Sequence, residues 1–168
     1  EEDEHEGAGV VGRVDKVWRD GNLIRWVGGL DGGGVHGTEA ARQIAGAWKG
    51  HVHFAAADSP VPPGEEWVHT QWELALARGR RGRPILLVLD EIQKVRGWSE
   101  AVKARWDQRG RTPDVRVLLL GSSALQVQRG LTESLAGRFL LHRCGHWSWP
   151  EMRTAFGFSL RDWIFFGG

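Results

Sequence analysis

The sequence predicts a three-layer α/β/α fold, in which helices cover both faces of a parallel β-sheet. An uninterrupted aliphatic run at residues 85–89 is typical of a strand that is buried on both faces, and the largely aliphatic residues 115–120 predict a second buried strand. Segments with helical periodicity lie between the predicted strands, and this alternation favours βαβ units. Because sheets of this kind bind ligands beyond the carboxyl ends of their strands, we expect the functional residues at that edge.

The N-terminal part of the chain carries the weakest structural signals. Residues 1–8 are acidic, which is typical of a solvated tail, and residues 23–27 predict a short strand. The glycine cluster at residues 28–34 argues against regular structure there, because glycine loses the most backbone entropy on folding. A helix is expected from Thr38 onward, since apolar side chains such as Ile44 recur on one face of the run.

The later elements follow in regular alternation, and turn or capping residues separate them. Prolines precede the helix expected after Gly64, and a serine with a glutamate three residues later is typical of a helix start near Ser148. Beyond the two aliphatic strands we expect strands at residues 52–56 and 139–143, helices at residues 65–78 and 99–108, short helical pieces at residues 124–129 and 131–136, and helices that begin near Ser148 and Ser159.

Composition limits the class of protein. The chain has 168 residues, of which 41% are hydrophobic and 26% are charged, as in ordinary globular proteins. Its one cysteine excludes an intramolecular disulfide and favours a reducing, cytoplasmic setting. No run approaches the roughly 20 apolar residues of a membrane-spanning helix. The absent initiator methionine and the abrupt end suggest a fragment of a longer protein.

Charge argues against a nucleic-acid or membrane partner. The formal net charge is +1, so the whole molecule produces no field that would recruit a polyanion. The basic turn at residues 78–83 has no interleaved aromatic side chains, and we interpret it as a solvated connection.

Asp90 and Glu91 come together at the carboxyl end of the strand predicted at residues 85–89. In P-loop ATPases an aspartate at this place holds Mg²⁺, and the next residue orients the attacking water. A rigid strand would deliver both carboxylates to the edge where phosphates lie. The alternative is that two acidic residues end a strand and cap the next loop. The features downstream favour the functional interpretation.

Two further positions could act on the same ligand. Ser122 and Ser123 follow the second aliphatic strand, where a polar side chain can contact the γ-phosphate or the attacking water. Alternatively, one of them caps the next helix. Arg138 stands just before the last predicted strand, where an arginine could stabilise charge on a transferring phosphoryl group, in the same chain or across a subunit interface. A surface ion pair between Arg138 and Glu133 explains the arginine equally well.

The chain resembles the prokaryotic AAA-type ATP-binding proteins called archaeal-type ATPases, in the stretches LLVLDEIQKVRGWSEAVKARWD, VLLLGSSALQVQRGLTESLAGRF and HWSWPEMRTAFGF. The resemblance runs from about Thr38 to Gly168. It implies a P-loop NTPase core with strand order 5-1-4-3-2 and a site for ATP with Mg²⁺. It also implies a C-terminal domain of unknown function that this chain lacks.

The resemblance assigns roles to the residues named above. It implies that Asp90 and Glu91 are the Walker B pair, that Ser122 or Ser123 is the sensor residue, and that Arg138 belongs to the family's GR motif. We therefore expect an acidic, irregular segment at residues 1–21, the ATPase core at residues 22–147, and the start of a following helical region at residues 148–168.

The phosphate-binding loop departs from the family pattern. That loop reads G-x-x-x-x-G-K-[ST]: its backbone N–H groups cradle the phosphates, its lysine reaches the β/γ oxygens and its hydroxyl binds Mg²⁺. Gly32 and Gly37 keep the glycine spacing if the lysine has been deleted before Thr38. In a second alignment Gly37 replaces the lysine and His36 replaces the last glycine. Both alignments lack the lysine, whereas Thr38 could still bind Mg²⁺.

Three accounts of this loop compete: a natural pseudo-ATPase, an engineered or mutated loop, and a reading-frame error upstream of Thr38. The reading-frame error is the account we favour, because residues 1–37 match nothing in the family while the residues from 38 onward match well.

Two functions follow from these patterns. The first is an AAA-type ATPase domain that couples ATP–Mg²⁺ binding and hydrolysis to a conformational change, with a degraded Walker A loop. The second is a catalytically dead pseudo-ATPase that acts as a protein-interaction module. Besides ATP, the expected partners are the C-terminal domain of the parent protein and, through Arg138, a second copy of the chain.

Overall fold

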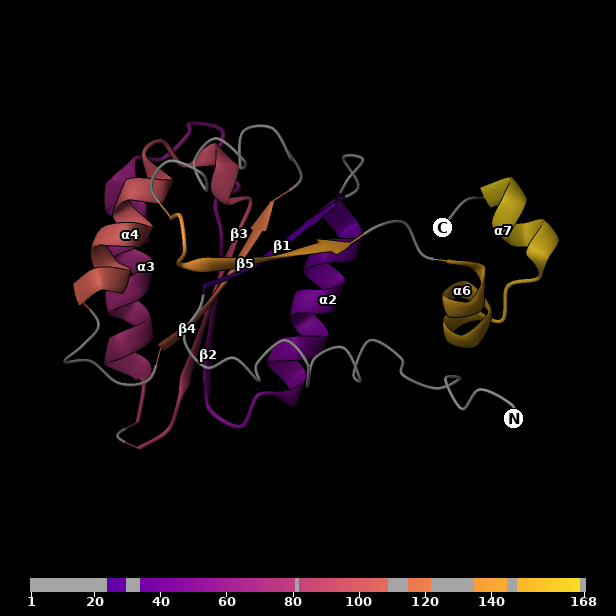
Figure 1. The fold of residues 1–168 in the computed structure, drawn as a ribbon, viewed down its shortest axis with the longest axis horizontal. Helices are drawn as coiled ribbons and strands as arrows, with labels where there is room; N and C mark the ends of the chain where they lie inside the picture. The colour runs from indigo at the N-terminus through magenta and orange to yellow at the C-terminus, as the bar shows by residue number, and fades with distance from the viewer. Residues whose placement is uncertain are drawn as a thin grey trace.

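The computed structural model describes residues 24–29, 34–80, 82–108, 115–121, 135–144 and 148–166. Within these residues, five strands form one sheet in the order β2-β3-β4-β1-β5, and every pair of neighbours is parallel (Figure 1). This is the order 5-1-4-3-2 read from the other edge of the sheet, so the predicted fold class is confirmed. The elements are β1 (Ile24–Gly29), α2 (Gly34–Ala47), β2 (His51–Ala56), α3 (Glu65–Arg78), β3 (Ile85–Asp90), the 3₁₀ turn η1 (Ile92–Lys94), α4 (Trp98–Gln108), β4 (Val115–Gly121), β5 (Phe139–Cys144), α6 (Trp149–Phe156) and α7 (Leu160–Phe166).

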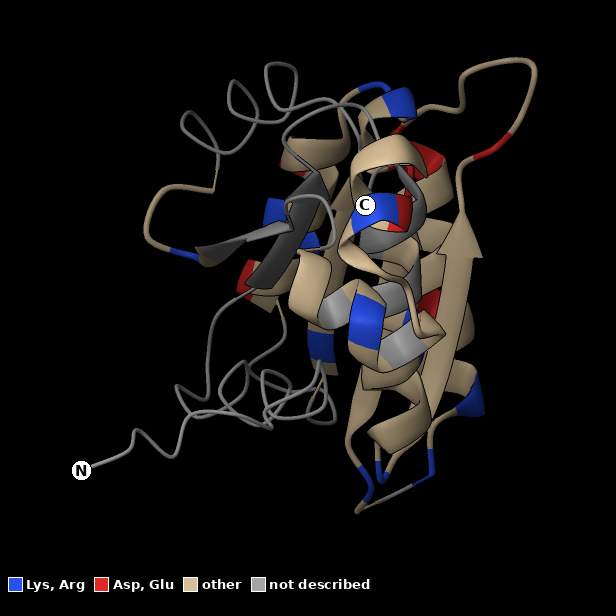
Figure 2. Cartoon of the chain, turned by 90° about the vertical axis from the view of Figure 1, so that its right-hand side faces the viewer, with Lys and Arg blue, Asp and Glu red and all other residues tan. Residues whose placement is uncertain are grey.

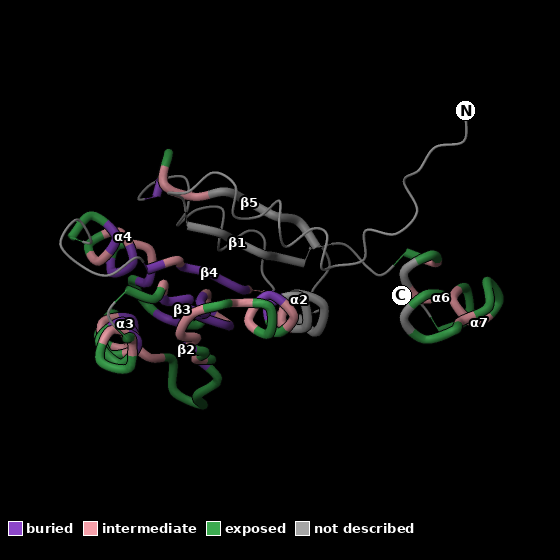
Figure 3. The backbone as a smooth tube through the Cα atoms, turned by 90° about the horizontal axis from the view of Figure 1, so that it is seen from below, coloured by how far each residue is buried: buried purple, intermediate pink, exposed green. Residues whose placement is uncertain are grey.

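The alternating side chains of β3 divide the core into two layers. Ile85, Leu87 and Leu89 pack with α3 and α4, whereas Leu86 and Val88 pack with α2 on the opposite face. All six residues of β3 are buried, which explains why the strand is a continuous apolar run in the sequence. Figure 1 shows α3 and α4 on one side of the sheet and α2 on the other, and Figure 3 shows that the buried segments concentrate in β3 and β4.

The glycine cluster differs from its prediction. Gly28 and Gly29 belong to β1, and Gly34 begins α2, four residues before the helix start that we expected at Thr38. β1 occupies an interior position of the sheet, where it pairs with β4 on one side and β5 on the other. Two ladders of backbone hydrogen bonds offset the entropy that glycine loses in a strand, so tertiary pairing overrides the local preference.

Helix α6 begins at Trp149, as expected near Ser148, and the capping signal at Ser159 is borne out at the start of α7. Asp162 accepts hydrogen bonds from the Ser159 backbone N–H (3.0 Å) and hydroxyl (2.6 Å), and the Asp162 N–H donates to that hydroxyl (3.2 Å), which fixes the start of α7. Among the predicted short helical pieces, residues 124–129 lie outside the described residues, and residues 135–138 form a turn. In the part of the chain that the structure describes, no helix is long and apolar enough to cross a membrane.

Candidate functional site

The carboxyl edge of the sheet brings Thr38 and Asp90 together. The Thr38 hydroxyl donates a hydrogen bond of 3.1 Å to Asp90 Oδ2, although 52 residues separate the two in sequence. Thr38 lies in the second turn of α2, and Asp90 is the last residue of β3, so two rigid elements position the contact. The predicted Mg²⁺-binding residues are therefore neighbours.

The Asp90 carboxyl is held in an enclosed polar site. Its exposed fraction is 8%, and its second oxygen accepts a hydrogen bond of 2.9 Å from the Glu91 backbone N–H. Burial raises the pKa of Asp90 above the ordinary value of 3.8, while the hydrogen bonds from Thr38 and from the Glu91 N–H oppose that rise. A nearby cation would be stabilised here, because it would neutralise a carboxylate that water reaches poorly.

Glu91 adopts a backbone conformation that is uncommon for a residue with a side chain. Its φ of 54° and ψ of 33° lie in the left-handed region, and among the described residues it alone has a positive φ without being glycine. The conformation turns the chain sharply out of β3 into η1. Such strain persists where the surroundings enforce it, and it is most common at functional sites.

Two side chains of η1 hold the Glu91 carboxylate. Gln93 Nε2 donates a hydrogen bond of 2.9 Å to Glu91 Oε2, and Lys94 Nζ lies 3.2 Å from the same oxygen. Lys94 also forms an ion pair of 2.9 Å with Asp58, just beyond β2. No motif in the sequence indicates Asp58, Gln93 or Lys94 as a site residue. The three-residue spacing between Glu91 and Lys94, together with the expected meeting of strand ends, could have indicated the cluster.

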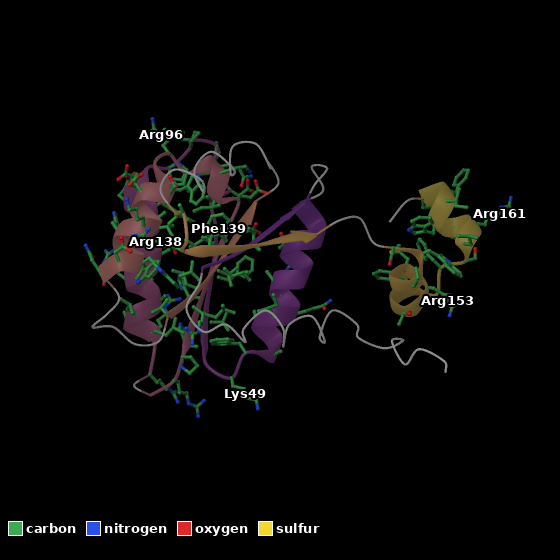
Figure 4. The ribbon with its side chains drawn as sticks, viewed as in Figure 1. Lys49, Arg96, Arg138, Phe139, Arg153 and Arg161 are labelled. Atoms are coloured by element: carbon green, nitrogen blue, oxygen red, sulfur yellow. The ribbon has the colours of Figure 1, made fainter. Side chains whose placement is uncertain are left out.

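Arg138 directly precedes β5 and so lies at the amino ends of the strands, opposite the carboxyl ends where Asp90 lies. The strand register places Phe139 level with Leu87, so Arg138 is four residues behind Asp90 along the strands and three strands away from it. That separation is on the order of 20 Å for ordinary strand geometry. The Arg138 guanidinium instead contacts Asp107, with Nε–Oδ1 2.9 Å and Nη2–Oδ2 3.3 Å (Figure 4 labels Arg138). The arginine has an acidic partner, as the alternative interpretation expected, but that partner is Asp107 of α4.

The remaining predicted residues are described in part or not at all. Gly32, Ser122 and Ser123 lie outside the described residues, so their predicted contacts stay predictions. Gly37 is the fourth residue of α2, within the first helical turn, whose backbone N–H groups have no partner inside the helix. Such a turn attracts anions, although this one carries no lysine.

The donor set fits Mg²⁺ better than a metal held by protein ligands alone. Among the residues that the structure describes, no three His, Cys, Asp or Glu side chains converge as a metal site. Mg²⁺ usually takes one or two protein oxygens and completes its shell with phosphate oxygens and water. The Asp90 carboxylate, with the Thr38 hydroxyl beside it, supplies oxygens of that kind.

In the absence of Mg²⁺, the stability of the Asp90→Asn variant should increase relative to that of wild type as pH rises. A carboxyl whose pKa is raised on folding binds more protons in the folded state, so its contribution to stability falls as pH increases from about 3.8 through the folded pKa. Asparagine does not titrate, and its contribution stays constant. Thermal melts of both proteins across this range provide the measurement. If the difference in melting temperature between the two proteins does not change with pH, the claim that folding raises the pKa of Asp90 is contradicted.

Comparison with solved structures agrees with the fold. A mutant of the Thermotoga maritima RuvB protein matches with a TM-score of 0.59 and 15% identity, over 86% of this chain and 47% of that chain. A DNA polymerase III gamma subunit-related protein from Thermotoga maritima matches with a TM-score of 0.57 and 8% identity, over 80% of this chain and 45% of that chain. The Aeropyrum pernix ORC2 protein in its ADP form matches with a TM-score of 0.50 and 13% identity, over 93% of this chain and 50% of that chain. At these identities the similarity concerns the fold, and the chain spans about half the length of each structure.

Sequence comparison identifies the family. No curated protein matches the sequence. A family model described as an AAA domain matches residues 50–153, which is more than half of the 168-residue chain. That match contains β3 with Asp90 and Glu91, together with the strands that order the sheet around it. The chain therefore belongs to the AAA domain family, whose fold is that of P-loop ATPases.

Proposed function

We propose that this chain is the nucleotide-binding core of an AAA-type ATPase, which binds ATP with Mg²⁺ at the carboxyl edge of β3 and the N-terminus of α2. The observation that carries the proposal is the 3.1 Å hydrogen bond between the Thr38 hydroxyl and Asp90. A hydroxyl and a carboxylate that share a hydrogen bond are close enough to face one cation. One of the similar structures, the ORC2 protein, is described in an ADP form, which is compatible with nucleotide binding by this fold.

Each residue of the site has a distinct role in this proposal. Asp90 and Thr38 hold Mg²⁺, which neutralises charge on the phosphates, and the first turn of α2 supplies backbone N–H groups to phosphate oxygens. Glu91 orients the water that attacks the γ-phosphate. Gln93 and Lys94 position its carboxylate through the contacts described above. Ser122 or Ser123 would contact the γ-phosphate or that water.

Arg138 enters this proposal only through a second copy of the chain. Its position at the amino edge of the sheet puts Asp90 of the same chain beyond the reach of one arginine side chain. A neighbouring subunit could bring its own Arg138 to the phosphates, where a guanidinium stabilises charge in the transition state. The ion pair with Asp107 is partly exposed, so exchanging it for phosphate contacts would cost little.

Calorimetric titration of ATP into the full chain tests nucleotide binding. With Mg²⁺ present we expect Asp90→Ala to weaken binding by about tenfold or more, since the variant loses the buried carboxylate that contacts Thr38. In EDTA the two proteins should differ little, because the carboxylate acts through the metal. Asp162→Ala, which changes an aspartate of α7, is the matched control. Equal affinities for wild type and Asp90→Ala in Mg²⁺ would overturn the assignment.

A catalytically dead pseudo-ATPase is the second candidate. It is favoured by the absence of a lysine from the loop and by α2 beginning at Gly34, which puts about 6 Å of helix between its first residue and Thr38. Phosphates bound at the first N–H groups would then lie farther from the Mg²⁺ ligands. If the folded wild-type chain shows no heat of ATP binding, this outcome favours the pseudo-ATPase. The chain would then act as an interaction module.

The finer family assignment belongs to the same proposal. The resemblance to archaeal-type ATPases, with a C-terminal domain beyond the core, is compatible with the exposed apolar side chains of α6 and α7, among them Phe156, Ile164 and Phe165. The domain limits at residues 21 and 147, the fragment status and the cytoplasmic setting remain predictions from the sequence.

A further inference from the structure

Four cationic side chains gather where β2 and β3 begin, at the edge of the sheet opposite the candidate ATP site. Lys49 precedes β2, Arg78 ends α3, and Arg80 and Arg83 belong to the connection that leads into β3. All four residues are exposed. We call this set the basic edge. Figure 2 shows the Lys and Arg segments at this end of the sheet, and Figure 4 shows Lys49 at the end of the molecule opposite Arg96.

Backbone contacts lock the two connections of the basic edge together. The His51 N–H donates a hydrogen bond of 3.0 Å to the Pro84 carbonyl, and the Trp48 indole N–H donates one of 3.3 Å to the same oxygen. Gly50 packs so closely that a Cβ there would lie 1.9 Å from that oxygen. Lys49 is therefore held beside the Arg83 connection by rigid structure.

The second connection is a tight turn. The Arg83 N–H donates a hydrogen bond of 3.1 Å to the Arg80 carbonyl, and Gly82 has a φ of 78°, a conformation that favours glycine. The hydrogen bond holds Arg80 and Arg83 close together, and Gly82, which has no side chain, directly precedes Arg83. A flat, extended anion could therefore approach the backbone closely at this point.

The basic edge lacks local charge compensation. Within the described ranges, none of its four side chains forms an ion pair, whereas Lys94, Arg105 and Arg138 each have an acidic partner. The net charge of +1 averages over this uneven distribution, since acidic Asp58, Asp90 and Glu91 lie at the opposite edge. The field near the basic edge is thus positive, although the field of the whole molecule is weak.

We propose that the basic edge binds the phosphodiester backbone of nucleic acid without sequence specificity. Three of its four cations are arginines, and guanidinium groups pair with phosphate oxygens through two parallel hydrogen bonds. The large apolar side chains that are exposed among the described residues lie elsewhere, at Phe54, Val61, Leu74 and on α6 and α7. A surface that inserts into a membrane, like the core of a protein interface, needs such side chains beside its charges. A repeating phosphate backbone needs only spaced cations.

Fluorescence anisotropy of a labelled DNA duplex, titrated with the full chain, tests the proposal. The variant Lys49→Gln/Arg80→Gln/Arg83→Gln should bind at least about tenfold more weakly, and the slope of log affinity against log salt should be shallower by about 3, one unit for each lost phosphate contact. The control Arg96→Gln/Arg153→Gln/Arg161→Gln lowers the formal net charge equally, from +1 to −2, away from the basic edge. It should retain the wild-type slope.

Two further arms keep the outcome decisive. Arg80→Lys/Arg83→Lys preserves the charge and should retain most of the binding, so a loss caused by misfolding is distinguishable from a loss of contacts. Vesicles that contain phosphatidylserine replace the duplex in the second arm, and binding to vesicles in preference to DNA would overturn the proposal. It would also be overturned if wild type bound no duplex at about 50 mM salt, or if both triple variants lost affinity equally.

Discussion

Replacing Gly37 with lysine is expected to tighten ATP–Mg²⁺ binding by about ten- to hundredfold. The residue immediately precedes Thr38 in α2, where one alignment of the loop places the missing phosphate-binding lysine. A charge-assisted hydrogen bond from a lysine to a phosphate oxygen contributes about 1.5–3 kcal/mol, and each 1.4 kcal/mol is tenfold in affinity. Calorimetry of the variant beside wild type gives the comparison directly.

Gly46→Lys is the matched control for this gain. Gly46 lies in the same helix, and a side chain added there meets nothing within 4 Å. Both substitutions replace a helical glycine with a better helix former and add one positive charge. A gain in affinity shared by the two variants would therefore reflect helix stability or net charge. A gain confined to Gly37→Lys would identify the loop as a phosphate site that lacks only its cation.

The alternative alignment of the loop makes a different prediction. If the lysine was deleted between Gly37 and Thr38, inserting one there should restore affinity better than substitution at Gly37. An insertion within α2 rotates the residues before it by about 100° relative to those after it, because the helix has 3.6 residues per turn. Thr38 and Asp90 would keep their contact, while the first turn would present different N–H groups to the phosphates. Titrating both variants distinguishes the alignments.

The fold was predictable from sequence where the hydrophobic pattern was strong. β3 is buried on both faces, so its aliphatic run is unbroken, and β4 is buried along most of its length, with the half-buried Arg116 near its start. Helix α3 begins and ends at the residues that its flanking prolines and glycines indicate. β1 and α2 were predicted less well. Gly28 pairs with Gly121 on one side and Arg143 on the other, and these partners come from segments far away in the sequence. Local glycine content cannot reveal pairing of that kind.

The candidate site likewise contains residues that sequence motifs predict and contacts that only the tertiary structure reveals. Asp90 and Thr38 follow from motifs, because the chemistry of Mg²⁺ and phosphate restricts both the residue types and their place at a strand end or a helix start. The contacts of Lys94 with Asp58 and Glu91 depend on how two loops meet in space. The left-handed conformation of Glu91 is likewise a product of the fold, since its sequence carries no turn signal. Such features emerge only once the strands are in register.

Gly50→Ala is expected to destabilise the domain by about 3 kcal/mol, at the upper end of the usual range for overpacking. The added Cβ would lie 1.9 Å from the Pro84 carbonyl oxygen and 2.7 Å from Trp48 Nε1. The φ of Gly50 lies outside the left-handed region, so the cost is steric. The carbonyl belongs to the backbone that begins β3, which cannot move without disturbing the centre of the sheet.

Thermal unfolding measures this cost, because a loss of about 3 kcal/mol lowers Tm by roughly 6–12 °C for a domain of this size. Gly46→Ala provides the control, since the same substitution into open space should leave Tm unchanged or slightly higher. A fall of less than about 2 °C for Gly50→Ala would mean that the two connections separate easily. In that case Lys49 would not be fixed beside Arg83, and the rigid spacing of the basic edge, on which its proposed contact with a phosphate backbone depends, would be lost as well.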